Sequence, residues 1–251
     1  MRDKKSSEVG ARRSSSESAR AERSEHDFVY DALCKALFEG KLRPGTPLRE
    51  RHLAEVFGVT RNAIRKVLLQ LSQEGKLQIY ANRGAYIPQP SSDDIREIYD
   101  ARRAVEAGLV AILAPRITAP QLARLKDHVR KERRALDQGR RDESVRLAGA
   151  FHNELVALAA NTALQEIVQR LVARTQMYVA LFESARDSGC APHEHEAIIE
   201  ALAKKDSARA VAAMMKHLHQ VEERVAERTQ DKKSTDVGLI LRNIFKGNDA
   251  A

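Results

Sequence analysis

Residues 60–75 fit a short helix with one buried side, and this segment limits the fold of the chain more than any other. Its apolar residues recur at positions i, i+3, i+4 and i+7, which predicts one buried face: Ile64, Val67, Leu68 and Leu71. Thr60 stands where an N-cap belongs, and Gly75 stands where a left-handed C-terminal residue belongs. Polar side chains fall on the other faces: Arg61, Asn62, Arg65 and Lys66.

The segments on both sides of this helix complete a recognisable unit. A shorter amphipathic helix is predicted over residues 48–57, and a turn at 58–59 separates the two helices, as in a helix-turn-helix. Residues 76–80 and 85–88 are predicted to be strands around a turn, which makes a wing. An α-helix fits the major groove of DNA, and Arg donors match guanine edges. A basic helix alone could be a solvated face, but the second helix and the wing favour DNA binding.

Residues 28–88 resemble the N-terminal winged helix of the GntR superfamily of bacterial transcription regulators. The resemblance is carried by Leu37, Gly40, Pro44, Gly45, Leu48, Glu50, Leu53, Ala54, Gly58, Val59, Thr60, Arg61, Ile64, Arg65, Leu71, Glu74, Gly75, Asn82, Arg83, Gly84, Ala85 and Ile87. The departures are Thr60 for the commoner Ser, Asn62 and Ala63 for Thr-Pro, and Lys66 for Glu. Lys66 adds a positive charge, so it is expected to change operator preference without abolishing DNA binding.

The resemblance implies that three arginines contact bases or phosphates and that Gly84 with its neighbours enters the minor groove. The predicted DNA-binding residues are Arg51, Thr60, Arg61, Asn62, Arg65, Lys66, Arg83 and Gly84. The charge distribution agrees with this prediction. Residues 1–90 hold 17 Lys and Arg against 11 Asp and Glu, whereas the remaining residues hold 26 against 24. Positive charge therefore concentrates where a polyanion is predicted to bind.

The composition and the helical periodicity predict a mainly α protein with an N-terminal winged helix-turn-helix and a C-terminal all-helical bundle. Helices are expected at 28–40, 93–114, 120–138, 143–160, 162–184, 192–204 and 207–229, with Ser92, Thr118, Asn161 and Asp206 as caps. Residues 44–47 are expected to form a loop. The predicted division is a disordered basic tail at 1–26, a winged helix at 27–88, a linker at 89–92, an effector-binding and dimerisation domain at 93–230, and an extension at 231–251. In that extension, residues 237–245 are apolar enough to pack on the bundle or on a second subunit.

Two features predict a cytoplasmic protein. Cys34 and Cys190 have no metal-ligand spacing, and nothing requires them to pair. No run approaches the roughly 18–20 apolar residues that cross a bilayer, and no apolar segment follows the N-terminal charges. No membrane partner is therefore expected.

The second half of the chain resembles the all-helical FCD effector domain of the FadR-like branch of the same superfamily. The residues that carry this resemblance are Ile98, Tyr99, Asp100, Ala101, Arg102, Val105, Glu106, Phe151, His152, Glu194, His195, Ile198, Met214 or Met215, His217 and Leu218. FCD domains of this kind bind an effector, and some bind a metal. The polar residues of this match are fewer than those of the N-terminal match.

His152, His195 and His217 are the predicted metal ligands, because imidazoles from different helices can hold a divalent ion inside a bundle. In metal-binding FCD domains an Asp four residues before the first histidine joins them, and this chain has Ala148 there. The family's four-ligand set is thus incomplete, although three histidines with water or a ligand carboxylate could still hold zinc or nickel. The alternative is that they are hydrogen-bonded core or surface residues. His193 is predicted to point elsewhere, and His128 and His219 are predicted to be surface residues.

Arg102 is predicted to bind a carboxylate of the effector, since FCD domains present a guanidinium at this position and its fork matches a carboxylate. A structural salt bridge is the alternative. Arg103 should point about 100° away, into solvent.

The leading hypothesis is a homodimeric, ligand-responsive transcription regulator, a repressor of an operon for organic-acid or sugar-acid metabolism, bound to a palindromic DNA operator. A nonspecific or architectural DNA-binding protein, whose bundle only dimerises, is the second hypothesis. A metal-dependent hydrolase is disfavoured, because no motif places a catalytic base and the winged helix would be unexplained.

Overall fold

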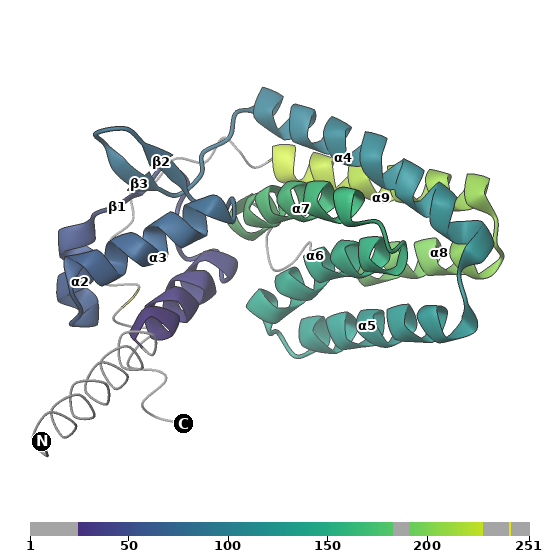
Figure 1. Cartoon of the computed structure of the whole chain (residues 1–251), viewed down its shortest axis with the longest axis horizontal. Helices are drawn as coiled ribbons and strands as arrows, with labels where there is room; N and C mark the ends of the chain where they lie inside the picture. The colour runs from purple at the N-terminus through teal and green to yellow at the C-terminus, as the bar shows by residue number, and fades with distance from the viewer. Residues whose placement is uncertain (1–24, 183–190, 228–240, 242–251) are drawn as a thin grey trace, which may run out of the picture.

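The computed structural model describes residues 25–182, 191–227 and 241, which form a winged helix and an all-helical bundle (Figure 1). The fold class predicted from the sequence is therefore confirmed. Residues 1–24 of the predicted tail, most of the extension at 231–251 and most of its apolar segment 237–245 lie outside the described residues. Residues 25 and 26 were predicted to belong to the disordered tail, but they are helical. In the extension, Leu241 is described, and its side chain is fully buried.

The winged helix has the predicted order of parts. It contains a helix over residues 25–38, β1 (Pro47–Leu48), α2 (Glu50–Phe57), α3 (Arg61–Gln73), β2 (Gln78–Tyr80) and β3 (Gly84–Tyr86). The side chain of Thr60 accepts a hydrogen bond from the backbone N–H of Ala63 at 3.2 Å, as an N-cap does. Gly75 has a φ of 75°, the left-handed conformation that ends the helix. The four apolar residues of α3 are buried, as predicted.

The first helix covers 25–38 rather than the predicted 28–40, and the wing strands cover 78–80 and 84–86 rather than 76–80 and 85–88. The prediction for residues 47 and 48 was wrong in kind. Residues 47 and 48 are neither loop nor helix but form β1, and α2 begins only at Glu50. β1 pairs antiparallel with β3, which places Leu48 opposite Ala85, and β2 pairs with the other edge of β3. The side chain of Leu48 is 2% exposed, so burying it beneath the sheet favours the strand over an earlier start of the helix.

The bundle contains α4 (Ser92–Leu113), a 3₁₀ turn η1 (Ala114–Arg116), α5 (Ala119–Asp137), α6 (Arg141–Leu158), α7 (Thr162–Phe182), α8 (Ala191–Ala203) and α9 (Ser207–Ala226). Wherever a predicted helix end falls within the described residues of the bundle, it agrees to within two residues. Thr118, Asn161 and Asp206 accept backbone hydrogen bonds as caps. Ser92 does not: Ser91 is the cap, because its side chain accepts from the N–H of Asp94 while the Asp94 carboxylate accepts from the N–H of Ser91.

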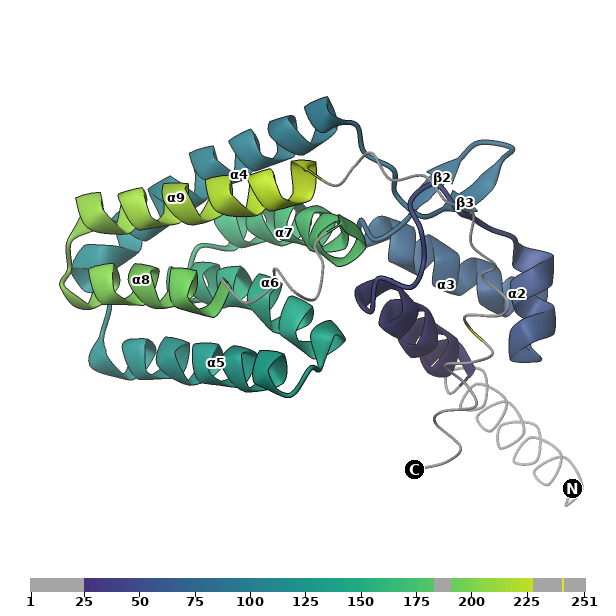
Figure 2. The same ribbon diagram turned by 180° about the vertical axis from the view of Figure 1, so that it is seen from behind.

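The six long helices surround one core in a closed ring. α4 packs against α9, α9 against α8, α8 against α5, α5 against α6, α6 against α7, and α7 against α4 (Figure 2). The largest fully buried side chains of this core include Tyr99, Phe151, Leu109 and Leu113. No helix among the described residues is long and apolar enough to cross a membrane.

The winged helix lies at one end of the bundle, beside α6 and α7 (Figures 1 and 2). Arg141, the first residue of α6, donates hydrogen bonds to the backbone carbonyls of Phe38 at 2.7 Å and of Ala180 at 3.1 Å. These two carbonyls belong to the winged helix and to α7. At Gly40, where φ is 66°, a Cβ atom would lie 2.8 Å from the carbonyl oxygen of Ala180. The two parts of the chain therefore pack closely at this point.

Candidate functional site

The eight residues predicted to contact DNA all lie exposed on the surface of the winged helix. α3 turns its apolar residues inward, so that Arg61, Asn62, Arg65 and Lys66 face solvent. Arg83 and Gly84 lie at the wing, where Gly84 has a φ of 86° and open space beside it. The winged helix thus presents a basic helix and a wing on its outside, which is the arrangement that enters adjacent DNA grooves.

Glu50 of α2 already contacts the arginines of α3. The Nε and Nη2 atoms of Arg65 donate to the two carboxylate oxygens of Glu50 at 2.8 and 2.7 Å, and Arg61 lies 3.6 Å from the same carboxylate. The hydrogen bond from Arg65 holds the pKa of Glu50 below its usual range. Both arginines remain more than 60% exposed, and exposed ion pairs contribute about 0–1 kcal/mol. Arg65 can therefore exchange Glu50 for a phosphate or a base at little cost. Sequence reasoning missed this contact.

Three imidazoles from three helices meet in the centre of the ring: His152 of α6, His195 of α8 and His217 of α9. Each is at most 3% exposed, and one ring nitrogen of each lies within 4.8 Å of the others. The Nε2 atoms of His152 and His217 are 3.2 Å apart. The structure therefore brings together the three histidines that the sequence singled out.

Each of these imidazoles is held at Nδ1 by its own glutamate. The distance is 2.5 Å from His152 to Glu106, 2.8 Å from His195 to Glu132 and 2.7 Å from His217 to Glu194. Burial alone would raise the pKa of Glu106, but Arg102 and His152 hold it well below the usual range. Burial also raises the pKa of Glu194, but hydrogen bonds with His217 and Arg224 have the larger effect and lower it to about 2. An ionised carboxylate only accepts hydrogen bonds, so Nδ1 of His152 and His217 carries the proton and Nε2 is bare.

Bare Nε2 atoms in these positions fit a divalent metal. Two lone pairs that face each other at 3.2 Å repel unless a cation lies between them, and Nε2 of His195 has no hydrogen-bond partner among the described residues. A tetrahedral zinc ion with Zn–N bonds of about 2.0–2.1 Å places its nitrogen ligands about 3.3 Å apart. Burial lowers the pKa of His152 to about 4 and of His217 to about 3, which keeps both in the neutral form that binds metals. The donor set is thus suited to zinc or nickel.

A cavity of about 40 Å³ lies beside the three histidines. Its remaining wall is formed by Arg102, Val145, Ala148, Gly149, Val172, Thr175, Gln176, Val179, Val221 and Arg224. None of these lining side chains carries a carboxylate, so at the position of Ala148 the protein offers the metal no fourth ligand. The cavity could hold a small anionic group of a ligand, because Arg102 and Arg224 in its wall are positively charged.

Arg102 lies at this cavity, and part of its guanidinium group is already hydrogen-bonded within the protein. It is 4% exposed, its Nε donates to Glu106 at 2.7 Å, and its Nη1 donates to Thr175 at 3.0 Å. Nη2 is buried and has no hydrogen-bond partner among the described residues. A guanidinium group has five N–H donors, so one N–H of Nη1 and both of Nη2 remain for a ligand, and the two-point contact with a carboxylate stays a prediction.

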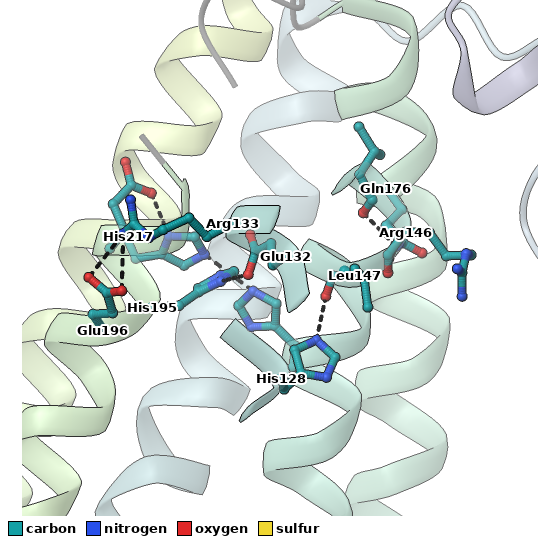
Figure 3. A network of polar contacts seen from close by, with 12 residues as sticks. His128, Glu132, Arg133, Arg146, Leu147, Gln176, His195, Glu196 and His217 are labelled. Carbon is teal, nitrogen blue, oxygen red and sulfur yellow. Dashed lines mark hydrogen bonds and ion pairs between the residues drawn. The ribbon is translucent and has the colours of Figure 1, made fainter. Parts of the chain in front are cut away.

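Three other expectations from the sequence were tested by the contacts. Arg103 does not point into solvent: it is 15% exposed and pairs with Asp100 and with Glu222 of α9. His128 is half-buried, with Nε2 2.8 Å from the carbonyl oxygen of Leu147, so it is not a surface residue (Figure 3). His219 is 63% exposed, as predicted.

The glutamates beside the histidines were missed as site residues. Glu132 gives the clearest signal in retrospect, because it continues the apolar stripe of α5 formed by Leu125 and Val129. An acidic residue on a stripe that must be buried requires a partner. The sequence does not say which partner, since His195 is 63 residues away.

The lowered histidine pKa values predict how the metal-free protein responds to acid. Unfolded imidazoles titrate near pH 6.5, so as the pH falls from about 7 to 5 the unfolded chain takes up protons that the folded chain does not. The free energy of unfolding should therefore decrease, by on the order of 2 kcal/mol at pH 5 for each of His152 and His217. Urea denaturation in the presence of a chelator measures this. His217→Gln should flatten the pH dependence and the exposed His219→Gln should not; equal slopes for both variants would contradict the assignment.

Comparison with known proteins gives a consistent result for both parts of the chain. Residues 25–87 match the family model of bacterial regulatory proteins of the gntR family, and residues 97–220 match that of the FCD domain. The chain is 26% identical over 204 residues to the HTH-type transcriptional repressor RspR of Escherichia coli K12, covering 81% of this chain and 90% of that protein. It is 28% identical over 206 residues to the HTH-type transcriptional regulator LutR of Bacillus subtilis 168, covering 73% and 93%. The structure of E. coli McbR/YncC has the same fold, with a TM-score of 0.65 at 20% identity over 81% of this chain and 97% of that chain.

Proposed function

Because the chain belongs to the GntR family of bacterial regulatory proteins and carries an FCD ligand-binding domain, we propose that it is a homodimeric repressor controlled by a metal-bound carboxylate. Its family and relatives are DNA-binding transcription regulators rather than enzymes. One observation carries the proposal. Three bare or unpartnered imidazole nitrogens and the free Nη2 of Arg102 converge on a cavity whose lining has no carboxylate.

The DNA-binding part of the proposal uses α3 and the wing. In a twofold dimer, two copies of α3 would enter successive major grooves about 34 Å apart on a palindromic operator. Arg51, Thr60, Arg61, Asn62, Arg65 and Lys66 would contact bases and phosphates, and Arg83 and Gly84 would reach the minor groove. We therefore propose that the protein acts in the bacterial cytoplasm, where its operator would lie.

The regulatory part uses the histidine cluster. His152, His195 and His217 would hold a zinc or nickel ion, and the bound ion would supply positive charge for the carboxylate of an effector. Nη2 of Arg102 would donate a hydrogen bond to that carboxylate, while the valine side chains of the cavity exclude water. We propose an organic acid or a sugar acid as the effector, with the operon for its metabolism as the target. The relative RspR is named a repressor, which supports a repressor role for this protein.

Helix α6 offers a route from the cavity to the DNA-binding part. It carries His152 in the cluster and Arg141 at its first residue, which donates to the Phe38 carbonyl of the winged helix. A displacement of α6 on ligand binding would therefore reach the winged helix through one hydrogen bond. The operator affinity then differs between the free and the effector-bound protein, as allosteric coupling requires.

The proposal is tested by selecting duplexes from a random pool and measuring affinity by fluorescence anisotropy. We expect a palindromic operator that random duplexes displace only at large excess, and an affinity that metal plus a matching carboxylate lowers. Equal competition by random duplexes would instead favour the architectural role. Carboxylates are found by a thermal-shift screen of metal-loaded protein.

A variant of Arg102 tests its role in the same screen. Arg102→Lys keeps a cation beside Glu106 but removes the Nη2 donor, and a charge-assisted hydrogen bond contributes about 1.5–3 kcal/mol, so carboxylate affinity should fall at least about 10-fold. Arg103→Ala is the matched control, because this neighbouring arginine does not line the cavity. Unchanged carboxylate binding in Arg102→Lys would remove Arg102 from the proposed site.

A further inference from the structure

We propose that Glu132 is the positioning residue that sets the metal affinity of this site, by supplying through His195 the negative charge that no fourth protein ligand provides. This inference rests on the proposed metal site. It concerns the three glutamates that accept from the histidine Nδ1 atoms, because Glu106 and Glu194 also pair with an arginine and Glu132 does not.

Glu132 is a fully buried carboxylate on α5. Its Oε2 accepts from Nδ1 of His195 at 2.8 Å, and Figure 3 shows the two side chains directed at one another across the centre of the ring. Its Oε1 is buried with no hydrogen-bond partner among the described residues. Burying a carboxylate is costly unless it is paired, so a charge at this position calls for a compensating cation.

The other two glutamates already have such a cation. Glu106 accepts from Arg102 at 2.7 Å, and Glu194 accepts from Arg224 at 2.8 and 3.2 Å. Glu132 forms no ion pair with any Arg or Lys among the described residues. The adjacent Arg133 points away and binds Glu196 (Figure 3).

The charges of the cluster can be added up from these contacts. Three carboxylates and two guanidinium groups surround three imidazoles, so the cluster carries a net charge of about −1 when its imidazoles are neutral. The uncompensated charge is that of Glu132. A divalent ion would convert the net charge to about +1, and one carboxylate from a ligand would then make the site neutral. Such a carboxylate would enter the cavity of about 40 Å³ that Ala148 lines.

Glu132 also acts on the ligand atom itself. A carboxylate that accepts the Nδ1 proton fixes the tautomer and the ring orientation and makes Nε2 a stronger donor. The charge of Glu106 and that of Glu194 are shared with a guanidinium group, whereas the charge of Glu132 is directed at His195 alone. Phe151 stacks on the His195 ring with 4.1 Å between centroids, which further fixes its orientation. His195 is therefore the ligand whose donor strength depends most on its glutamate.

The experiment uses Glu132→Gln in the full chain, with Co²⁺ and Zn²⁺ as probes and a chelator as competitor. Gln keeps an oxygen that can accept from Nδ1 and removes the charge. We expect a 10- to 100-fold loss of affinity for both ions, the range found when outer partners of metal ligands are replaced. We also expect a changed Co²⁺ absorption spectrum, and a metal-free protein that unfolds at the same or a higher temperature. Glu132→Asp, which keeps the charge, should recover part of the affinity.

Glu196→Gln is the matched control, because it removes one carboxylate from the residue next to His195 but outside the cluster. It should bind both ions like the wild type. Wild-type affinity and spectrum in Glu132→Gln would overturn the inference and leave the proposed metal site intact. A wild-type protein that binds neither ion would overturn both.

Discussion

Replacing His195 by alanine should remove most of the metal-dependent stabilisation of this protein. The variant loses the imidazole whose Nε2 lacks any other partner in the described structure, and two histidines remain. Replacing even an outer partner typically costs 10- to 100-fold in metal affinity, so losing a direct ligand should cost more than about 100-fold. Zn²⁺ or Ni²⁺ at about 1,000 times its dissociation constant stabilises the wild type by about 4 kcal/mol. This corresponds to an increase in Tm of roughly 8–16 °C for a chain of this size.

The measurement is a pair of thermal denaturation curves, with and without metal, on protein purified without a histidine tag. His219→Ala is the control, since this imidazole is exposed and lies outside the cluster. Metal content by elemental analysis gives an independent readout. A metal-induced shift of the same size in His195→Ala and in the wild type would show that the ion binds elsewhere, and the three-histidine site would then be rejected.

Replacing both Arg61 and Arg65 by alanine should have the second largest effect, on operator affinity. A good contact from Arg to a base edge contributes about 1–3 kcal/mol of discrimination, which is about 5- to 150-fold for each residue that makes one. Binding to random duplexes should weaken less, because it depends mainly on phosphate contacts. Each lost phosphate contact should also reduce, by about one, the slope of the logarithm of the binding constant against the logarithm of the salt concentration. Operator titrations at several salt concentrations measure both effects.

Arg96 provides the control for charge. It is an exposed arginine of α4 that pairs with Asp93, so Arg96→Ala removes one positive charge from outside the winged helix, against two in the double variant. We expect operator binding close to that of the wild type. If the double variant of α3 also binds operator and random duplexes as the wild type does, α3 is not the recognition helix.

Much of the fold follows from short stretches of sequence. The apolar spacing in α3, its cap Thr60 and its C-terminal Gly75 are local features, and the structure has all of them. The cap of α4 shows where local reasoning stops. Ser91 and Ser92 are adjacent serines before the same acidic residues, and the choice between them depends on the hydrogen bond to Asp94.

In the candidate site, too, some of the residues could be predicted from the sequence but their long-range contacts could not. The three histidines could be found because a resemblance pointed to them, but the contacts that give them chemical character join residues far apart in the chain. Glu132 and His195 are 63 residues apart, and Arg141 and Phe38 are 103 residues apart. The prediction that Arg103 points into solvent was wrong because α9 places Glu222 against it. Such pairings depend on how helices pack, which helical periodicity in one segment does not specify.

The contact between Glu50 and Arg65 has a consequence for how the protein searches a genome. The carboxylate occupies the guanidinium fork in the way a DNA phosphate would, so any duplex must displace an internal competitor before it gains that arginine. A stretch of arbitrary sequence offers only a phosphate in exchange, whereas a correctly placed guanine offers two acceptors in the plane of the fork. The pair therefore subtracts the same small free energy, about 0–1 kcal/mol, from binding to every duplex. With millions of arbitrary sites present, that loss leaves more of the protein unbound between encounters, and it lowers operator affinity by the same factor.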